Sequence, residues 1–145
     1  MAKDDAKGNG SSGLDGAGAD ELGYVQQIYQ NQYAVATNSI NMVLQELQEL
    51  NSAQKTLENV DMVEGKEVLT SIGADTFFFG RVQSAKSVIM AVGGGYLVEK
   101  EIDPAKERIA AVIHARTERL NRLMKNRKEL ESALIEISYR LGSMH

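Results

Sequence analysis

The stretch "VIMAVGGGYLVEK", residues 88–100, joins two β-like runs through Gly93, Gly94 and Gly95. Three consecutive glycines fit either a phosphate-binding loop or the tight turn of a β-hairpin. A phosphate-binding loop of the G-x-G-x-x-G or GKS/GKT type leads into the N-terminus of a helix, whose free N–H groups hold the phosphate. Here the strand-like "YLVEK" follows the glycines. We therefore predict a hairpin turn, in which glycine tolerates positive φ.

Strand-like runs also surround this stretch, between residues 66 and 102. They are rich in β-branched and aromatic side chains and read "EVLTSI", "TFFFGRV", "SVIMAV" and "GYLVEKEI", divided by the turn signals "GAD", "SAK" and "GGG". This pattern predicts four short strands that form two β-hairpins. The chain has too few other residues to cover both faces of its strands, so apolar side chains there need a partner surface. We expect oligomerisation through this segment.

Before the strands, an apolar stripe predicts a helix over residues 22–60. Its members recur alternately every four and three residues, the 3.5-residue period of a coiled coil, over about five heptads. They are Leu22, Gln26, Tyr29, Tyr33, Ala36, Ile40, Val43, Leu47, Leu50, Gln54 and Leu57. Residues 1–21 are instead rich in Gly, Ala, Ser and Asp and predict a disordered tail.

A second stripe of the same period follows the strands and predicts a helix over residues 104–142. Asp103 is placed as its N-cap and Pro104 as its first residue. The members of this stripe are Ile109, Ile113, Arg116, Leu120, Leu123, Arg127, Leu130, Leu134, Ile137, Leu141 and Met144.

The two stripes have the same number of positions, so folding the chain back on itself predicts one antiparallel coiled-coil hairpin. In the simplest register, with a slip by one heptad left open, the facing pairs are Leu57 with Ile109, Leu47 with Leu120, and Leu22 with Met144. Arg116 and Arg127 occupy positions that a dry interface resists. We expect them to extend to solvent or to meet Glu46 or Glu49.

Composition narrows the range of functions. The 145 residues suit about one domain, and the absence of Cys excludes disulfides, thiolate ligands and a thiol nucleophile. The net charge of -4 argues against nucleic-acid binding, and the basic stretch at residues 119–128 is typical of a solvated coiled-coil face. No apolar run approaches the ~20 residues that span a bilayer, and no signal peptide is visible, so we expect a cytoplasmic protein without a membrane partner.

No group of residues predicts catalysis, a cofactor or a metal. His114 lies beside the second stripe and His145 is the last residue, and neither has a Cys, Ser or carboxylate cluster at a suitable spacing. The carboxylates on the predicted helices are explained by solubility; they are Glu46, Glu49, Glu129 and Glu131. We therefore assign no catalytic, cofactor-binding or metal-binding residue and expect no enzyme.

Apolar side chains outside the stripes gather near the free ends of the two predicted helices. They are Tyr24, Val25, Ile28, Ile135 and Tyr139, whereas in the middle of the second helix only Met124 adds apolar bulk. Extra packing between neighbouring helices explains this widening, as does a stripe drawn one position wrong, and so does a binding site for exposed apolar chain. Val35 and Leu44 are off-stripe apolar residues away from the ends, so periodicity leaves these explanations open.

A helix, two β-hairpins and a helix of matched length resemble the alpha-type subunit of the prefoldin family, in its archaeal form. The single-hairpin beta-type subunit is a poorer match. The resemblance spans residues 22–142 and rests on "IGADTFFFGRV", on "VIMAVGGGYLVEK" and on "DPAKERI" at the start of the second helix. One departure is "LTSIG" in the first strand, where the family commonly has a Pro ahead of the hydrophobic-Gly pair.

The resemblance implies an α+β fold, with the two β-hairpins at the connecting end of a long antiparallel helix hairpin. It implies a hexamer of two alpha and four beta subunits, whose hairpins form a double β-barrel platform. It also implies an ATP-independent holdase that binds non-native proteins, prevents their aggregation and delivers them to a group II chaperonin. One alternative is a structural coiled-coil adaptor without chaperone activity. The other, a small enzyme or nucleotide switch, needs a helix after Gly95.

The resemblance also assigns residues to these two tasks. Client binding falls to a helix-end set, which consists of Leu22, Tyr24, Val25, Ile28, Tyr29, Ile135, Ile137, Tyr139, Leu141 and Met144. Subunit assembly falls to a hairpin set, which consists of Phe77, Phe79, Val88, Ile89, Val92, Tyr96 and Val98.

Overall fold

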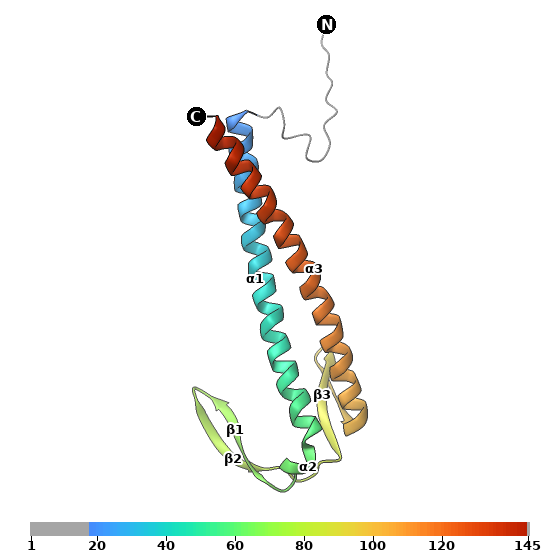
Figure 1. The fold of residues 1–145 in the computed structure, drawn as a ribbon. Coiled ribbons are helices and arrows are strands. Elements are labelled where there is room, and N and C mark those ends of the chain that lie inside the picture. The colour runs from blue at the N-terminus through green and yellow to red at the C-terminus, as the bar shows by residue number, and fades with distance from the viewer. Residues whose placement is uncertain (1–17, 145) are drawn as a thin grey trace. The chain divides into compact units, whose positions relative to one another are not determined.

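The computed structural model describes residues 18–144, which form two long helices, one short helix and four strands (Figure 1). In chain order these are α1 (Ala19–Glu58), α2 (Val60–Val63), β1 (Glu67–Gly73), β2 (Thr76–Arg81), β3 (Ser87–Gly93), β4 (Tyr96–Glu101) and α3 (Ile102–Ser143). The predicted order of helix, two hairpins and helix is confirmed. The predicted tail lies outside the described residues as far as position 17.

Both long helices begin earlier than predicted. Helix α1 begins at Ala19 rather than at residue 22, with Asp20 and Glu21 in its first turn, where acidic side chains favour the positive end of the helix dipole. Helix α3 begins at Ile102, so the predicted N-cap Asp103 lies inside its first turn. The N–H of Ile102 donates to the carbonyl of Lys86 at 3.2 Å, because strand β4 continues directly into the helix.

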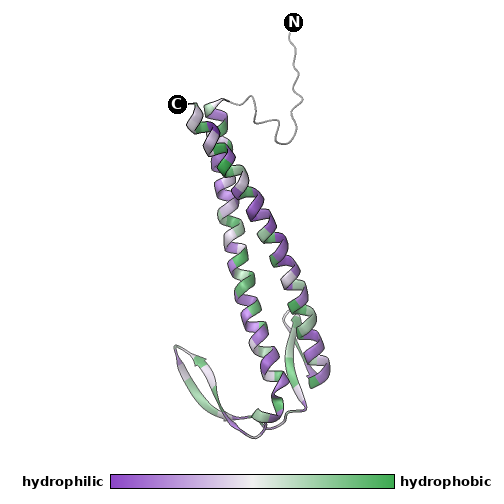
Figure 2. Cartoon of the chain, in the orientation of Figure 1, coloured by the Kyte–Doolittle hydropathy of each residue, from purple (hydrophilic) through white to green (hydrophobic). Residues whose placement is uncertain are grey.

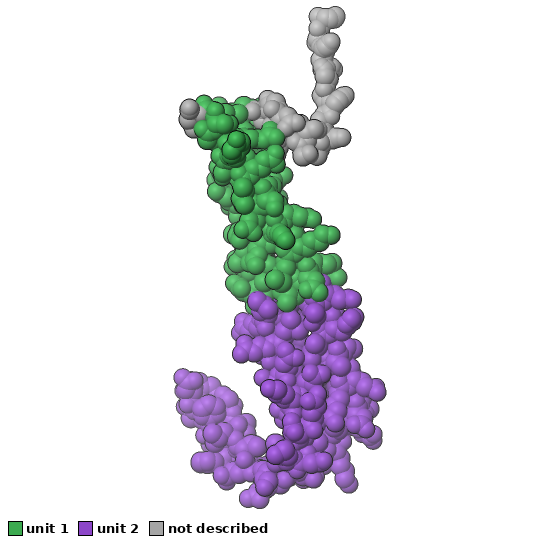
Figure 3. Space-filling model, in the orientation of Figure 1, with its two compact units in different colours: residues 1–42, 120–145 green, residues 43–119 purple. Residues whose placement is uncertain are grey.

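The chain divides into two compact units (Figure 3): residues 1–42 with 120–145, and residues 43–119. In the first unit α1 and α3 run antiparallel. Gln26 Nε2 donates to Ser138 Oγ at 3.2 Å, and Arg127 Nη1 donates to Thr37 Oγ1 at 3.5 Å. Between these bonds the chain advances 11 residues on α1 (26 to 37) and returns 11 on α3 (138 to 127).

The predicted stripes form the interior of the first unit. Its buried apolar residues are Leu22, Ala36, Ile40, Leu130 and Ile137. Every stripe position in this unit is buried or half-buried except Met144, which is 46% exposed. The predicted pairing of Leu22 with Met144 is wrong in this respect, because α3 ends at Ser143 and Met144 lies beyond the helix.

The second unit has its own apolar core where the helices meet the second hairpin. Leu57, Ala105 and Ile109 are buried together, which confirms the predicted proximity of Leu57 and Ile109. The half-buried residues packed against them are Leu50, Ala53, Val88, Met90, Ile102 and Ile113. Because Val88 and Met90 belong to β3, one face of the second hairpin is covered by its own chain.

The two arginines in the stripe find different partners. Arg116 Nε donates to Glu46 Oε2 at 2.6 Å in the second unit, as predicted. Arg127 meets neither predicted glutamate; besides Thr37, its guanidinium carbon lies 5.9 Å from the centroid of the Tyr33 ring, within cation–π range. The second stripe therefore tolerates two arginines because polar or aromatic groups of α1 receive them.

The strands form two separate two-stranded antiparallel sheets, β1 with β2 and β3 with β4. Each is closed by two residues with positive φ, Ala74 and Asp75 in the first hairpin and Gly94 and Gly95 in the second. Positive φ at both central positions is the mark of a type I′ turn, whose twist suits a hairpin. Gly93, which precedes the second turn, also has a positive φ, of 107°. All three glycines therefore lie in the predicted hairpin turn, which is confirmed.

Candidate functional site

The first hairpin carries apolar side chains on both of its faces. Strand pairing places Leu69 opposite Phe79 on one face, and Thr70 opposite Phe78 on the other. All three apolar side chains are largely exposed: Leu69 is 62%, Phe79 is 76% and Phe78 is 65% exposed. Because no residue of the described chain covers either face extensively, this hairpin presents an unusually apolar surface.

The second hairpin is open on one face and partly covered on the other. Ile89 and Leu97 lie on its exposed face, at 70% and 68% exposure, whereas Val88 and Met90 pack against the core of the second unit. Alternate residues of a strand point to opposite faces, which is why neighbours in β3 differ so strongly. Val88 is half-buried against the core of the second unit, and its assignment to subunit assembly stays a prediction.

The rest of the hairpin set lies on exposed surface, and the prediction omitted several similar residues. Phe77, Val92, Tyr96 and Val98 range from 37% to 73% exposed. The omitted residues with exposed large apolar side chains are Leu69, Ile72, Phe78 and Leu97. Strand alternation could have found Phe78, because the run of three phenylalanines must present its middle member on the opposite face. Figure 2 shows how apolar residues dominate the strands of both hairpins.

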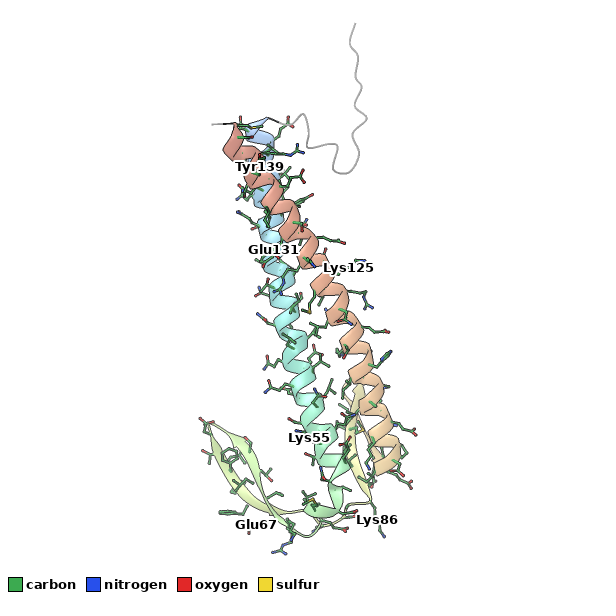
Figure 4. All side chains as sticks on the ribbon, viewed as in Figure 1. Lys55, Glu67, Lys86, Lys125, Glu131 and Tyr139 are labelled. Atoms are coloured by element: carbon green, nitrogen blue, oxygen red, sulfur yellow. The ribbon has the colours of Figure 1, made fainter. Side chains whose placement is uncertain are left out.

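The helix-end set separates into exposed and buried residues. Its exposed members are Tyr24, Ile135, Tyr139 and Met144, of which Tyr139, labelled in Figure 4, is 78% exposed. Its half-buried members are Val25, Ile28, Tyr29 and Leu141. Leu22 and Ile137 have no exposed area, because both belong to the packed stripes, so their assignment to a contact surface is wrong.

Among the residues that the structure describes, His114 and the glycine run, which are candidate sites in the sequence, show no sign of a catalytic or phosphate-binding site. His114 Nε2 lies 3.2 Å from Glu118 Oε1, one helical turn along α3, and the His114 side chain is 76% exposed. His145 lies outside the described residues. Strand β4, not a helix, follows Gly95. Within residues 18–144, no group of three or more His, Cys, Asp or Glu side chains is placed to hold a metal ion.

Across that same part of the chain, no helix is both long and apolar enough to span a membrane. Large apolar side chains are exposed both on the hairpins and near the helix ends.

Known proteins share this arrangement. A family model described as "Prefoldin subunit" matches residues 29–142. Prefoldin subunit alpha 1 of Thermococcus kodakarensis is 34% identical over 61% of this chain and 61% of that protein. Prefoldin subunit alpha of Pyrococcus horikoshii is 29% identical over 86% of this chain and 81% of that protein. A filamentous PFD from Methanocaldococcus jannaschii, solved by cryo-EM, has a TM-score of 0.54 at 22% identity, covering 82% of this chain and 93% of that one.

This chain belongs to the prefoldin family of chaperone subunits. The family model matches most of its length, and two long helices flank two β-hairpins in the sequence. Within that family it is of the alpha type, since relatives in several archaea carry that designation and it has the two hairpins that the alpha resemblance implied. Prefoldins are a family of non-enzymatic chaperones.

Proposed function

We propose that this chain is the alpha subunit of an ATP-independent holdase. In this proposal it joins beta-type subunits through its hairpins in a hexamer of two alpha and four beta subunits. The assembled complex binds non-native proteins through the exposed helix-end residues, prevents their aggregation in the cytoplasm and delivers them to a group II chaperonin. This proposal is supported by its similarity to proteins that are named prefoldin alpha subunits.

The observation that carries this proposal is the separation of two kinds of exposed apolar surface. The hairpins expose Phe78, Phe79 and Ile89 beside unpaired strand edges, a combination suited to a fixed contact between subunits. In the other unit, Tyr24 and Tyr139 are 68% and 78% exposed on helices α1 and α3. Single aromatic side chains on a helix surface suit weak contacts with many sequences.

Weak contacts are what a holdase requires. Burying one such side chain contributes ~1.5–3 kcal/mol before the bound chain is ordered, so one subunit alone holds a client loosely. Several subunits that engage one client raise the overall affinity through effective concentration. Release to a chaperonin then needs no nucleotide, because each contact breaks independently.

The test measures suppression of aggregation. The chain, alone and together with a beta-type partner, is mixed with a chemically denatured client, and light scattering is followed without nucleotide. We expect the complex to suppress scattering, and the variant Tyr24→Ser/Ile135→Ser/Tyr139→Ser to lose most of that suppression while native mass spectrometry shows an intact complex. Leu44→Ser removes an apolar side chain that is 48% exposed elsewhere on α1 and serves as the matched control.

The outcomes separate the alternatives. Absence of suppression by the wild-type complex, together with binding to folded partners, would favour the coiled-coil adaptor. Full suppression by the triple variant would reject the helix ends as the binding surface. Turnover of ATP in the same mixture would reject the proposed mechanism.

A further inference from the structure

Helix α1 lacks charge along one long segment. Residues 22–42 contain no Asp, Glu, Lys, Arg or His, although this is a solvent-facing helix of a coiled coil. The equally long segment of α3 at residues 120–140 contains the charged residues Arg122, Lys125, Arg127, Lys128, Glu129, Glu131, Glu136 and Arg140. Both segments belong to the first unit and pack on one another. Solubility explains the charged helix and leaves the uncharged one unexplained.

A second apolar stripe runs along this uncharged segment, outside the packed interior. Tyr24, Ile28, Val35 and Met42 follow one another at steps of four, seven and seven residues, which places them on one side of the helix. Tyr24, Val35 and Met42 are 68%, 64% and 64% exposed, and Ile28 is half-buried. We call these residues the α1 side stripe.

A groove of ≈ 350 Å³ lies beside the centre of the α1 side stripe, between the two helices of the first unit. Its lining includes Val35 and Leu123, which are apolar, and the side-chain amides of Asn31, Gln32 and Asn126. A groove lined by both apolar side chains and amide groups offers burial for a side chain and hydrogen bonds for a peptide group.

From these features we propose that the α1 side stripe and its groove bind a charge-poor, unfolded segment of a client polypeptide. The contact with non-native protein then runs along α1 from Tyr24 to Met42 and does not stop at the helix ends. This inference rests on the proposed holdase function and deepens it, because it adds a second stretch of surface and a preference for segments without charge.

The chemistry of the face selects this occupant. An unfolded segment has unpaired backbone N–H and C=O groups, and the amides of Asn31, Gln32 and Asn126 can satisfy them where the segment leaves water. A folded partner already pairs those groups internally. Because residues 22–42 of α1 carry no charge, binding of an apolar segment there removes no charged group of α1 from water. Apolar segments of many sequences are therefore accommodated at little electrostatic cost. The stripe also shares Tyr24 and Ile28 with the helix-end set.

The experiment measures binding of a fluorescently labelled, charge-free peptide of Leu, Ser and Gly to the complex with beta-type subunits, by anisotropy. We expect Val35→Ser/Met42→Ser to weaken binding about tenfold, since two apolar contacts are lost. Met124→Ser removes another exposed methionine of the same unit, on α3, and should change binding little.

An isosteric pair tests the role of charge. Gln32→Glu places a carboxylate at the groove without a change of shape, and we expect several-fold weaker binding. Gln27→Glu makes the same change about 140° around the helix from position 32 and should leave binding unchanged.

The results distinguish this inference from the function on which it rests. If Val35→Ser/Met42→Ser and Gln32→Glu bind the peptide as tightly as wild type, while the helix-end triple variant fails, the inference is overturned and the holdase proposal stands. If Val35→Ser/Met42→Ser or Gln32→Glu changes the mass of the complex, the α1 side stripe is a subunit contact and the inference is again overturned. Failure of the wild-type complex to suppress aggregation or bind the peptide overturns both proposals.

Discussion

The two β-hairpins share one backbone design and differ in how their faces are used. Each pairs a strand of seven residues with one of six, each has an irregularity before its turn, and each turn follows a glycine with a φ slightly above 100°. Yet the second hairpin packs Val88 and Met90 against helices α1 and α3, whereas the first is exposed on both faces.

Local sequence determines where the strands form. The two hairpins differ in how their bases join the rest of the chain. The first hairpin is held at its base by hydrogen bonds of the flanking chain: Gly65 N donates to Val82 O at 2.8 Å, Arg81 Nη1 donates to Gly65 O at 3.2 Å, and Ala85 N donates to Glu64 Oε1 at 2.9 Å. The second runs directly into α3, which brings β3 beside Ala105 and Ile109. One hairpin therefore belongs to the core of its subunit, and the other stays exposed, which is why we propose it as the surface that contacts a different chain.

The largest effect is expected from the open hairpin. Phe78→Ser/Phe79→Ser removes one aromatic side chain from each face, and the loss of both contacts should weaken assembly with beta-type subunits by about 3 kcal/mol or more, over a hundredfold in Kd. Analytical ultracentrifugation measures the loss, and far-ultraviolet circular dichroism should remain unchanged. A complex of normal mass and affinity would show that the first hairpin is not an assembly surface.

A smaller effect is expected from the docked hairpin, and it should appear in the subunit itself. Val88→Ala/Met90→Ala leaves space beside Leu57 and Ile109, and should lower the free energy of unfolding in urea by about 2 kcal/mol, below the full value for core positions because both are half-buried. The control Ile89→Ala changes the intervening, exposed residue. Equal effects from the two variants would contradict the docking of β3.

The turns should give the smallest effect. Gly94→Ala places a side chain at a φ of 63° and brings its Cβ to 3.4 Å from the Tyr96 ring, so we expect about 1 kcal/mol of local destabilisation. Amide hydrogen exchange along the β3–β4 ladder measures it. The converse change, Ala74→Gly, relieves a similar penalty but adds entropy to the unfolded chain, and should alter β1–β2 exchange by only about 0.5 kcal/mol. A larger penalty from Ala74→Gly would mean that the turns are not equivalent.

Periodic patterns in the sequence were enough to predict the elements, but not every contact. A step of four and three residues places Ala36 or Ile137 in the interior whatever the partner helix is, so both stripes could be recognised. The burial of Val88 depends on how β3 lies against α3, which alternation within a strand does not specify. Likewise, Arg127 could be recognised as an intruder in the stripe, but its contact with Tyr33 depends on the register of two helices.

The same limit applies to the candidate surfaces. An apolar residue near a helix end was assigned to client binding whether it lay on the stripe or beside it, and only packing separates Leu22 from Tyr24. The α1 side stripe was partly visible, since Val35 was noted as lying off the main stripe. The groove beside it could not be predicted, because it is formed by residues more than 80 positions apart in the chain.

The unpaired strands have a consequence for the life of the subunit before assembly. Within residues 18–144 each strand has one neighbour, so each hairpin offers its outer backbone groups, together with exposed phenylalanines, to any chain that can extend beside it. An orphan subunit thus displays the features of a misfolded protein. If partner subunits cover these hairpins, as we propose, we expect a cell that makes this chain in excess of its partners to degrade the surplus, which would tie the abundance of the subunit to that of its partners.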